Sequence, residues 1–253
     1  MRAAFGAKDA EPVRVDGRLW RCDDIGFRPA TSPAETAWIG QTLGDLEVPD
    51  LRIGRPLSSS DGRWAVGGWS AFKFLDGEIE PHYDEVIAAS LRLHKATADL
   101  ERPRFLAERK DVFAKADKAA WDDEVPNLDD KLGGKLFGVL AGSRQPVKLK
   151  SQVVHGDLFG NVLFVDHAQP GIIDFTAYWR PAEWAAAVVA VDAIAWGGGD
   201  SGLLQRWSHL AEWPQSLLRA LLFRLAAHAM HPQSTEDSLR GLEHASHEIT
   251  ALL

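Results

Sequence analysis

The sequence predicts an α+β protein of two lobes, a small β-rich one followed by a larger and mainly helical one. Short apolar runs divided by turn residues fill the first 75 residues, as in a small antiparallel sheet. From residue 82 onward, apolar residues recur with the 3.6-residue period of helices. A group of short strands interrupts the helical part between residues 152 and 175. This order of elements is that of an α+β fold. We therefore expect a first lobe at residues 1–75 and a second at 76–253.

Short extended runs in the first lobe predict its strands. Each run holds apolar or β-branched residues and is bounded by Gly, Asp or Pro, which favour turns. The predicted strands are residues 12–15, 19–22, 25–28, 52–56, 63–66 and 69–74. Gly67-Gly68 supplies the turn between the last two.

One helix is predicted within this first lobe. Ser32-Pro33-Ala34-Glu35 has the favoured capping residue, a proline suited to the first turn, and a glutamate three residues after the serine. This capping box predicts a helix that continues through Leu43.

The second lobe is predicted to be helical on both sides of its short strands. The predicted strands are residues 152–154, 162–165 and 171–175, and the predicted helices start near residue 82, after Pro181 and at Leu217, with a charged and mostly helical stretch at 107–150 and a last helix at the end.

Charge and composition exclude several functional classes. The net charge of −8 argues against nucleic acid as the main partner. The chain has no run of 18 apolar residues, so we expect no membrane span, and its first residues lack the apolar core of a signal peptide. We therefore expect a cytoplasmic protein. The one cysteine, Cys22, has no disulfide partner within the chain and is predicted to be a buried structural residue.

The most informative motif begins at His155-Gly156-Asp157. Asn161 follows before an apolar strand, and Asp174 ends another apolar strand thirteen residues after Asn161. His-Gly-Asp alone has little specificity, but the whole combination is more specific. The alternative is structural: an Asp in an Asx-turn, a capping Asn and an ordinary Asp at the end of a strand.

This combination resembles the catalytic loop and metal-binding segment of the aminoglycoside phosphotransferase and choline kinase-like family, which are relatives of protein kinases. The resemblance implies a bilobal protein-kinase-like fold. The family usually has five residues from the Asp to the Asn, whereas Asp157 and Asn161 are four apart. The loop must therefore close one residue shorter, with Gly160 relieving the backbone. The chain is also similar to an uncharacterised actinobacterial group that shares this short loop and Trp179-Arg180-Pro181.

The chemistry of phosphoryl transfer explains why these residue types are needed. The reaction depends on positioning and on neutralising charge at the phosphates. Asn161 and Asp174 offer the hard oxygen ligands that Mg²⁺ prefers. Asp157 is expected to accept or orient the proton of the substrate hydroxyl. His155 is expected to brace the loop.

The nucleotide-binding residues expected in the first lobe depart from the family pattern. The resemblance implies a Lys on a strand and a Glu on the next helix, and here Arg28 and Glu35 occupy these places. Arg28 is otherwise a strand-end charge, and Glu35 otherwise serves the capping box. The turn between the first two strands has one glycine, Gly17, and Asp16 adds a negative charge where a phosphate-binding loop usually has more glycine.

Residues 69–74 are the expected linker between the lobes. Their backbone would bond an adenine, and Phe72 and Phe74 would form aromatic walls of the pocket. The alternative is a buried edge strand of the first lobe.

Other polar residues have simpler interpretations. His94 is interpreted as a packing or capping histidine. Five helical histidines lack zinc-ligand spacing: His209, His228, His231, His244 and His247. Asp192 lies in an apolar helix, where a buried carboxylate needs partners, so we expect it to brace the catalytic loop or cap backbone donors. The acidic stretches 122–124 and 129–130 are a solvated face or attract a cationic substrate.

The sequence therefore predicts a phosphotransferase that uses Mg²⁺ and ATP or GTP to phosphorylate a hydroxyl of a small molecule or peptide. The main alternative is a catalytically weakened kinase-like module that binds a peptide or a partner enzyme. Transfer of a nucleotide is a weaker third possibility.

Overall fold

The computed structural model describes the chain from Met1 to Leu253 except residues 16, 31, 123 and 125. The chain forms two compact units, which we call unit 1 (residues 1–80 and 160–175) and unit 2 (residues 81–159 and 176–253). Residues 160–175 therefore group with the first 80 residues. The expected single boundary between residues 75 and 76 had assigned them to the second lobe. The lobe roles attached to that boundary stay predictions.

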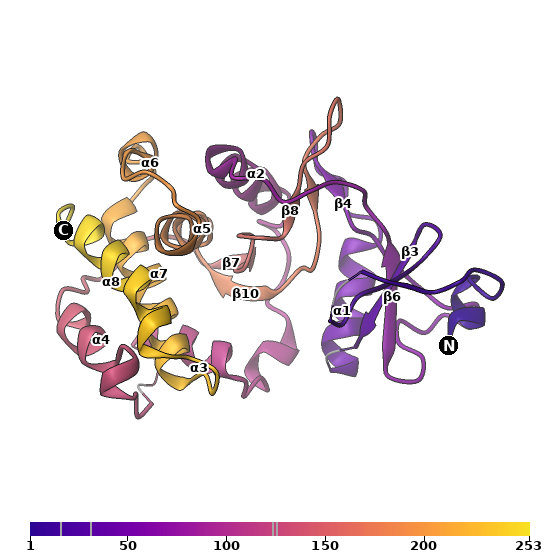
Figure 1. The fold of residues 1–253 in the computed structure, drawn as a ribbon, viewed down its shortest axis with the longest axis horizontal. Helices are drawn as coiled ribbons and strands as arrows, with labels where there is room; N and C mark the ends of the chain where they lie inside the picture. Colours follow the sequence, from indigo (N-terminus) through magenta and orange to yellow (C-terminus); the bar gives the residue numbers. More distant parts are fainter. Residues whose placement is uncertain (16, 31, 123, 125) are drawn as a thin grey trace. The chain divides into compact units, whose positions relative to one another are not determined.

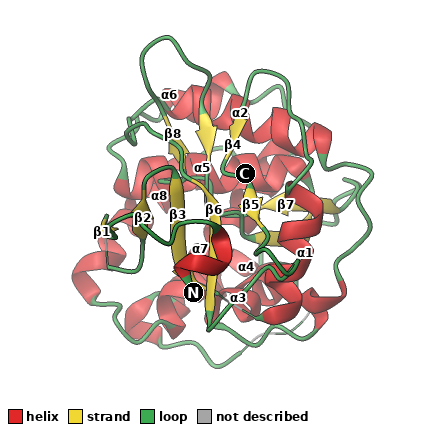
Figure 2. Cartoon of the chain, turned by 90° about the vertical axis from the view of Figure 1, so that its right-hand side faces the viewer, coloured by secondary structure: helices red, strands yellow, loops and turns green. Residues whose placement is uncertain are grey.

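Unit 1 contains a five-stranded sheet with the order β1-β2-β3-β6-β5, in which all neighbours are antiparallel (Figure 2). Phe5, Cys22, Phe27 and Ala71 form its buried core, and Cys22 is a free thiol, as expected. The strands are β1 (Val13–Arg14), β2 (Trp20–Cys22), β3 (Ile25–Pro29), β5 (Pro56–Leu57) and β6 (Trp69–Lys73), and a 3-10 helix, η1 (Arg2–Phe5), precedes them.

Two expectations for this sheet are wrong. Residues 69–73 are strand β6, paired on both sides, and so are neither a linker nor an edge strand. Residues 63–66 form no strand, and Val66 alone bridges to Trp69 around a glycine turn with positive φ angles. The physical reason is local. Ser59 N–H donates to Arg63 O at 2.8 Å, and Ser59 Oγ accepts from Arg63 N–H at 3.0 Å. The backbone groups of Arg63 are therefore bonded to Ser59 and do not pair with a neighbouring strand.

Helix α1 (Pro33–Leu43) begins where the sequence predicts it. Ser32 Oγ accepts a hydrogen bond from Glu35 N–H at 3.1 Å, and Pro33 occupies the first turn. Ile39 and Leu43 are buried.

A second small sheet attaches residues 160–175 to unit 1. Strand β4 (Arg52–Ile53) pairs in parallel with β9 (Gly171–Ile172), and β9 pairs antiparallel with β8 (Val162–Leu163). Glu78 also bridges to Phe164. The β8–β9 hairpin is thus fixed by contacts far away in sequence.

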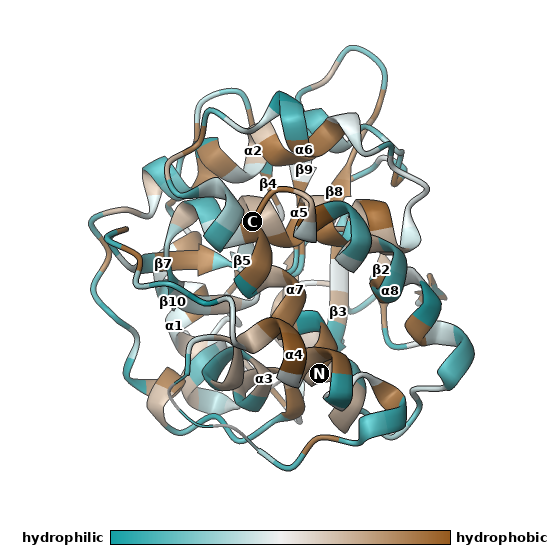
Figure 3. Ribbon diagram, turned by 90° about the vertical axis from the view of Figure 1, so that its left-hand side faces the viewer, coloured by the Kyte–Doolittle hydropathy of each residue, from teal (hydrophilic) through white to brown (hydrophobic). Residues whose placement is uncertain are grey.

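Unit 2 is mainly helical. Helix α7 packs against α3, α4, α5 and α8, with α5 also contacting α2 and α8 (Figure 1). Nearly the whole of α5 is buried, and Figure 3 shows it largely in brown where much of the outer helix α8 is teal. The helices are α2 (Tyr83–Ala96), η2 (Arg104–Ala107), α3 (Val112–Ala120), η3 (Asp130–Leu132), α4 (Gly134–Ala141), α5 (Ala182–Trp196), α6 (Gly202–Arg206), α7 (Trp213–Met230) and α8 (Glu236–Thr250).

Two antiparallel strands lie among these helices, β7 (Gln152–His155) and β10 (Ala177–Arg180). The sequence predicted β7 but not β10. None of the described helices has both the length and the apolar content that crossing a bilayer requires.

Candidate functional site

The catalytic loop predicted from the sequence leaves the end of β7 in unit 2. His155 is fully buried, and its ring nitrogen Nδ1 accepts a hydrogen bond from Asp157 N–H at 3.2 Å. Gly156 N–H donates to Thr176 O at 3.1 Å. These contacts tie the start of the loop both to its own histidine and to the residue before β10.

His94 of α2 supports the same loop. Its Nε2 accepts from His155 N–H at 2.9 Å, and Ser90 Oγ lies 3.2 Å from its Nδ1. Burial lowers the pKa of His94 to about 3, and the neighbouring His155 adds to this effect. His94 is therefore a neutral acceptor for a backbone donor of the loop, which its sequence position alone did not reveal.

A buried arginine holds Asp157. Arg224 Nη2 donates to Asp157 Oδ1 at 2.8 Å, while Arg224 Nε donates to Asp192 Oδ1 at 2.7 Å. The Asp192 side chain is 1% exposed, whereas the Asp157 side chain is 45% exposed. Burial raises the pKa of Asp192 to about 6, because it outweighs the attraction of Arg224. Asp157 is thus anchored by Arg224 while nearly half of its side chain is exposed.

Asn161 and Asp174 meet at one end of the β8–β9 hairpin in unit 1. The register pairs Val162 with Ile172, and Ile173 N–H donates to Asn161 O at 3.1 Å. The next residue, Asp174, has a φ of 50°, an uncommon backbone conformation for a residue other than glycine. Strain of this kind persists where the surrounding structure imposes it and is frequent at functional sites.

The predicted short loop closes with the help of Gly160. This residue has a φ of 79°, a conformation that costs glycine little. Asn161 follows it directly, so the turn sets where the hairpin begins.

Arg28 at the end of β3 contacts Asp174 within unit 1. Its Nη1 donates to the Asp174 carboxylate, and its guanidinium carbon lies 5.4 Å from the centre of the Phe72 ring. Burial lowers the pKa of Arg28, while the charge of Glu35 opposes that change. Arg28 therefore lies next to Glu35, Phe72 and Asp174. The sequence predicted a direct charge pair only between Arg28 and Glu35.

Phe74 lies beside a different arginine. The guanidinium carbon of Arg21 is 4.2 Å from the centre of its ring. The Phe72 ring covers Gly26, where a Cβ atom would come within 2.4 Å of it. Both aromatic rings are thus partly covered by residues of the sheet.

The turn between β1 and β2 is short. Val15 N–H donates to Leu19 O at 2.9 Å, and Arg14 Nη2 donates to Gly17 O at 3.1 Å. Asp16, which the sequence singled out for its charge, lies outside the described residues.

The side chains at 161 and 174 are of the types that would suit a magnesium ion. Asn161 pairs with Ile173, the residue before Asp174, and an amide oxygen and a carboxylate are the hard oxygen donors that would suit Mg²⁺. Across the part of the chain that the structure describes, no group of three or more His, Cys, Asp or Glu side chains is arranged to hold a metal.

Several side chains of the acidic stretches at 122–124 and 129–130 make contacts within the chain but stay exposed. Asp122 pairs with Arg144 at 2.9 Å, Glu124 pairs with Lys118 at 3.2 Å, and Asp129 caps η3. Asp123 lies outside the described residues.

Comparison with known structures supports the fold. An aminoglycoside phosphotransferase from Alicyclobacillus acidocaldarius superposes with a TM-score of 0.60 at 17% identity, over 99% of this chain and 93% of the other. A spectinomycin phosphotransferase solved with ADP and spectinomycin gives a TM-score of 0.55 at 15% identity, over 96% and 92% of the two chains. A choline/ethanolamine kinase family protein from Mesorhizobium loti gives 0.56 at 15% identity, over 96% and 88%.

Sequence comparison identifies the family. No curated protein sequence matches the chain significantly, and the similarity to an actinobacterial group stays a prediction. The model of the phosphotransferase enzyme family matches residues 28–178, more than half of the chain, from Arg28 to Tyr178. The chain therefore belongs to the phosphotransferase enzyme family and has the α+β, protein-kinase-like fold of the aminoglycoside phosphotransferases.

Proposed function

We propose that the protein transfers the γ-phosphoryl group of ATP or GTP to a hydroxyl of a small molecule or peptide. The observation that carries this proposal is how Asp157 is held and how far it is exposed. One of its oxygens is bound by a buried arginine, and its side chain is nearly half exposed, at the start of a loop braced by two histidines. A carboxylate held in this way suits a general base, because its position is fixed while part of it stays accessible.

In the proposed reaction, Asp157 accepts the proton of the acceptor hydroxyl. The acceptor oxygen forms a bond to the γ-phosphorus, the bond between that phosphorus and the bridging oxygen breaks, and the nucleoside diphosphate leaves. Arg224 is a positioning residue, since it holds Asp157 from the side that faces the core.

The nucleotide is assigned to residues of unit 1. We propose that Arg28 contacts its phosphates with Glu35 as charge partner, and that Phe72 and Phe74 lie near its base. Asn161 and Asp174 would hold Mg²⁺, which supplies positive charge to the phosphates when bound. Two similar solved structures support the nucleotide: an amicoumacin kinase was solved with AMP-PNP and Ca²⁺, and an aminoglycoside phosphotransferase with ADP and hygromycin B.

A thermal-shift panel of nucleotides with and without Mg²⁺ tests the proposal without knowledge of the acceptor. We expect ATP or GTP to raise the Tm only with the metal, and Asp174→Asn to remove the rise. Asparagine suits the left-handed conformation of residue 174, so this variant tests the carboxylate and not the backbone. Asp166→Asn, an exposed carboxylate of unit 1, is the matched control. The absence of a shift with every nucleotide would refute the proposal.

Two observations favour a second candidate, a kinase-like module with weakened catalysis that binds a peptide or partner enzyme. Arg28 places a cation on the carboxylate that would bind the metal, and the β1–β2 turn contains one glycine. If the protein is such a module, the Asp157→Asn variant keeps the cellular function. If it is a phosphotransferase, the same variant loses that function.

A further inference from the structure

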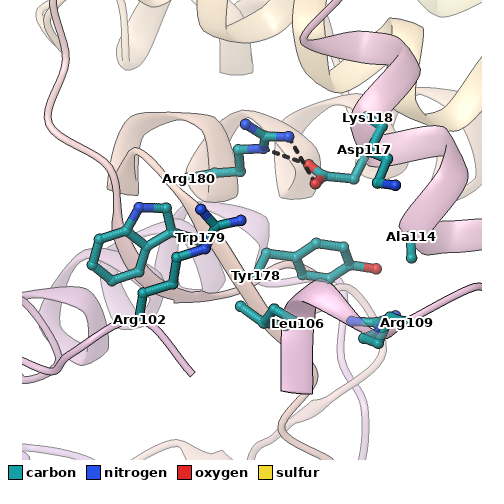
Figure 4. Close-up of a pocket in the computed structure, with 9 residues that line it drawn as sticks. All are labelled: Arg102, Leu106, Arg109, Ala114, Asp117, Lys118, Tyr178, Trp179 and Arg180. Atoms are coloured by element: carbon teal, nitrogen blue, oxygen red, sulfur yellow. Dashed lines mark hydrogen bonds and ion pairs between the residues drawn. The ribbon is translucent and has the colours of Figure 1, made fainter. Parts of the chain in front are cut away.

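A pocket of about 350 Å³ opens within unit 2, next to the strand that pairs with β7. Its walls come from the segment around η2, from α3 and from β10. Figure 4 shows Arg102 and Trp179 on one side, Arg109 and the Tyr178 hydroxyl on the other, and the Arg180–Asp117 pair above them. The lining residues are Arg102, Leu106, Arg109, Ala114, Asp117, Lys118, Tyr178, Trp179 and Arg180, which we call the basic pocket.

The charge of the basic pocket is opposite to that of the protein. Four of its nine lining residues are cationic and one is acidic, in a chain with a net charge of −8. The single lining carboxylate, Asp117, is already bound by Arg180 through hydrogen bonds of 2.7 and 2.9 Å. A cationic ligand would therefore meet repulsion here, and an anionic one would meet an excess of donors.

Two of these arginines are held in place by the fold. The side chains of Arg109 and Arg180 are 13% and 15% exposed. Arg109 bonds Asp111 through two hydrogen bonds of 2.9 and 3.0 Å and donates to Ala177 O at 3.0 Å. Guanidinium groups fixed in this way are preorganised for oxyanions, because little side-chain entropy remains to be lost.

The other two cations are available to a ligand. Arg102 is exposed, and among the described residues it has neither a hydrogen-bond nor an ion-pair partner. Lys118 makes a 3.2 Å pair with Glu124 in which the side chains are 43% and 67% exposed, and an ion pair with this much solvent contact contributes little to stability.

The basic pocket lies beside the catalytic loop. Strand β10 pairs Ala177 with His155 and Tyr178 with Val154. The Tyr178 ring covers Gly156, where a Cβ atom would come within 2.4 Å of it. Tyr178 therefore both lines the pocket and contacts the loop that carries Asp157.

From this arrangement we propose that the basic pocket binds an anionic group of the phosphoryl acceptor, so that the acceptor is a hydroxyl compound bearing a carboxylate or a phosphate. This inference rests on the proposed phosphotransferase function and narrows its substrate class. It separates this chain from relatives that act on aminoglycosides, whose amino groups are cationic. Trp179 and Tyr178 add apolar and aromatic surface next to the anion-binding groups.

The test compares small hydroxyl compounds that differ in charge. Glycerol, glycerate, glycerol 3-phosphate and ethanolamine are titrated into the full chain by calorimetry without nucleotide. We expect measurable binding of glycerate and glycerol 3-phosphate and none of glycerol or ethanolamine. Comparison of the two anions tells a carboxylate site from a phosphate site, and inorganic phosphate shows whether the phosphate alone suffices.

Variants locate the binding. Arg102→Glu is expected to weaken binding of the anions by about tenfold or more, since charge-assisted hydrogen bonds to oxyanions are among the strongest. Lys135→Glu, which makes the same charge change on the exposed face of α4, is expected to leave it unchanged. Equal binding of ethanolamine, no binding of either anion, or equal losses in both variants would overturn the inference. Mg²⁺-dependent nucleotide hydrolysis by the same sample, lost in Asp157→Asn, would support the proposed function even if the basic pocket fails.

Discussion

The guanidinium of Arg28 donates a hydrogen bond to the carboxylate of Asp174, 146 positions further along the chain. The family resemblance expects a cation for the phosphates at the first position and a metal ligand at the second. In this structure the two groups neutralise each other within unit 1. A metal ion at Asp174 would have to share this carboxylate with Arg28 or displace it.

The Arg28–Asp174 pair predicts that Arg28→Gln will bind divalent metal more tightly in the absence of nucleotide. The gain should be at most about fivefold, because partly exposed ion pairs contribute about 0.2–1 kcal/mol. Calorimetric titration with Mn²⁺ measures it. Arg21→Gln removes a similar guanidinium, paired with Asp76, from the same sheet and should have no effect. Unchanged Mn²⁺ affinity in Arg28→Gln would show that the pair does not compete with the metal.

Arg224 gives a prediction that separates stability from catalysis. Arg224→Met leaves Asp192 buried without its partner, so the free energy of unfolding should fall by about 3–5 kcal/mol. The double variant Arg224→Met with Asp192→Leu should recover most of that loss, because apolar residues replace the whole buried pair.

The double variant should still be slow, since Asp157 has lost the arginine that positions it. Chemical denaturation measures the stability, and basal nucleotide hydrolysis measures kcat separately from KM. A stable double variant with the kcat of the original protein would rule out a positioning role for Arg224.

His94 predicts how stability depends on pH. In the unfolded chain a histidine takes up a proton near its ordinary pKa of 6.5, whereas folded His94 stays neutral until about pH 3. Its contribution to stability is therefore complete above pH 6.5 and is lost as the pH falls toward 3. At pH 5 the loss is about 2 kcal/mol, from 1.36 kcal/mol for each unit below 6.5.

Replacing His94 tests that source of acid sensitivity. His94→Gln retains a hydrogen-bond acceptor but cannot titrate, so denaturation between pH 7 and 5 should show a shallower decline than the original protein. His244→Gln, at an exposed position of α8, should decline as the original does. Parallel curves for the original protein and His94→Gln would contradict the assignment.

Two loop glycines predict different costs for the same change. Gly160→Ala meets no atom within 4 Å and should lose about 1 kcal/mol of stability from its positive φ alone. Gly156→Ala places a methyl group 2.4 Å from the Tyr178 ring and should lose about 1–3 kcal/mol through overpacking. Gly138→Ala, in open space on α4, should instead stabilise the protein by up to about 1 kcal/mol. Equal losses at 156 and 160 would contradict this distinction.

Local patterns in the sequence predicted much of the fold. The cap at Ser32, the hairpin of β2 and β3 and the start of α5 after Pro181 depend on nearby residues, and each is present. The loop from β7 to β8 could also be located, because its polar residues are bounded by apolar strands.

Features that depend on distant pairing could not be predicted in this way. Strand β10 forms because it pairs with β7. Residues 63–66 form no strand because the Ser59 side chain bonds the backbone of Arg63. Arg224 lies among apolar residues of α7, and its link to Asp157 spans 67 positions. The basic pocket likewise combines three segments whose charges are ordinary when each is taken alone.

Calorimetric titration of Mg²⁺ and a non-hydrolysable ATP analogue most directly tests whether Asn161 and Asp174 serve a metal-bound nucleotide while Asp157 serves the acceptor. We predict binding of one nucleotide per chain, weakened at least about tenfold by omitting Mg²⁺ or by Asp174→Asn, and unchanged by Asp157→Asn. Binding that is equal with and without the metal and in all three proteins, or no binding at all, would contradict it.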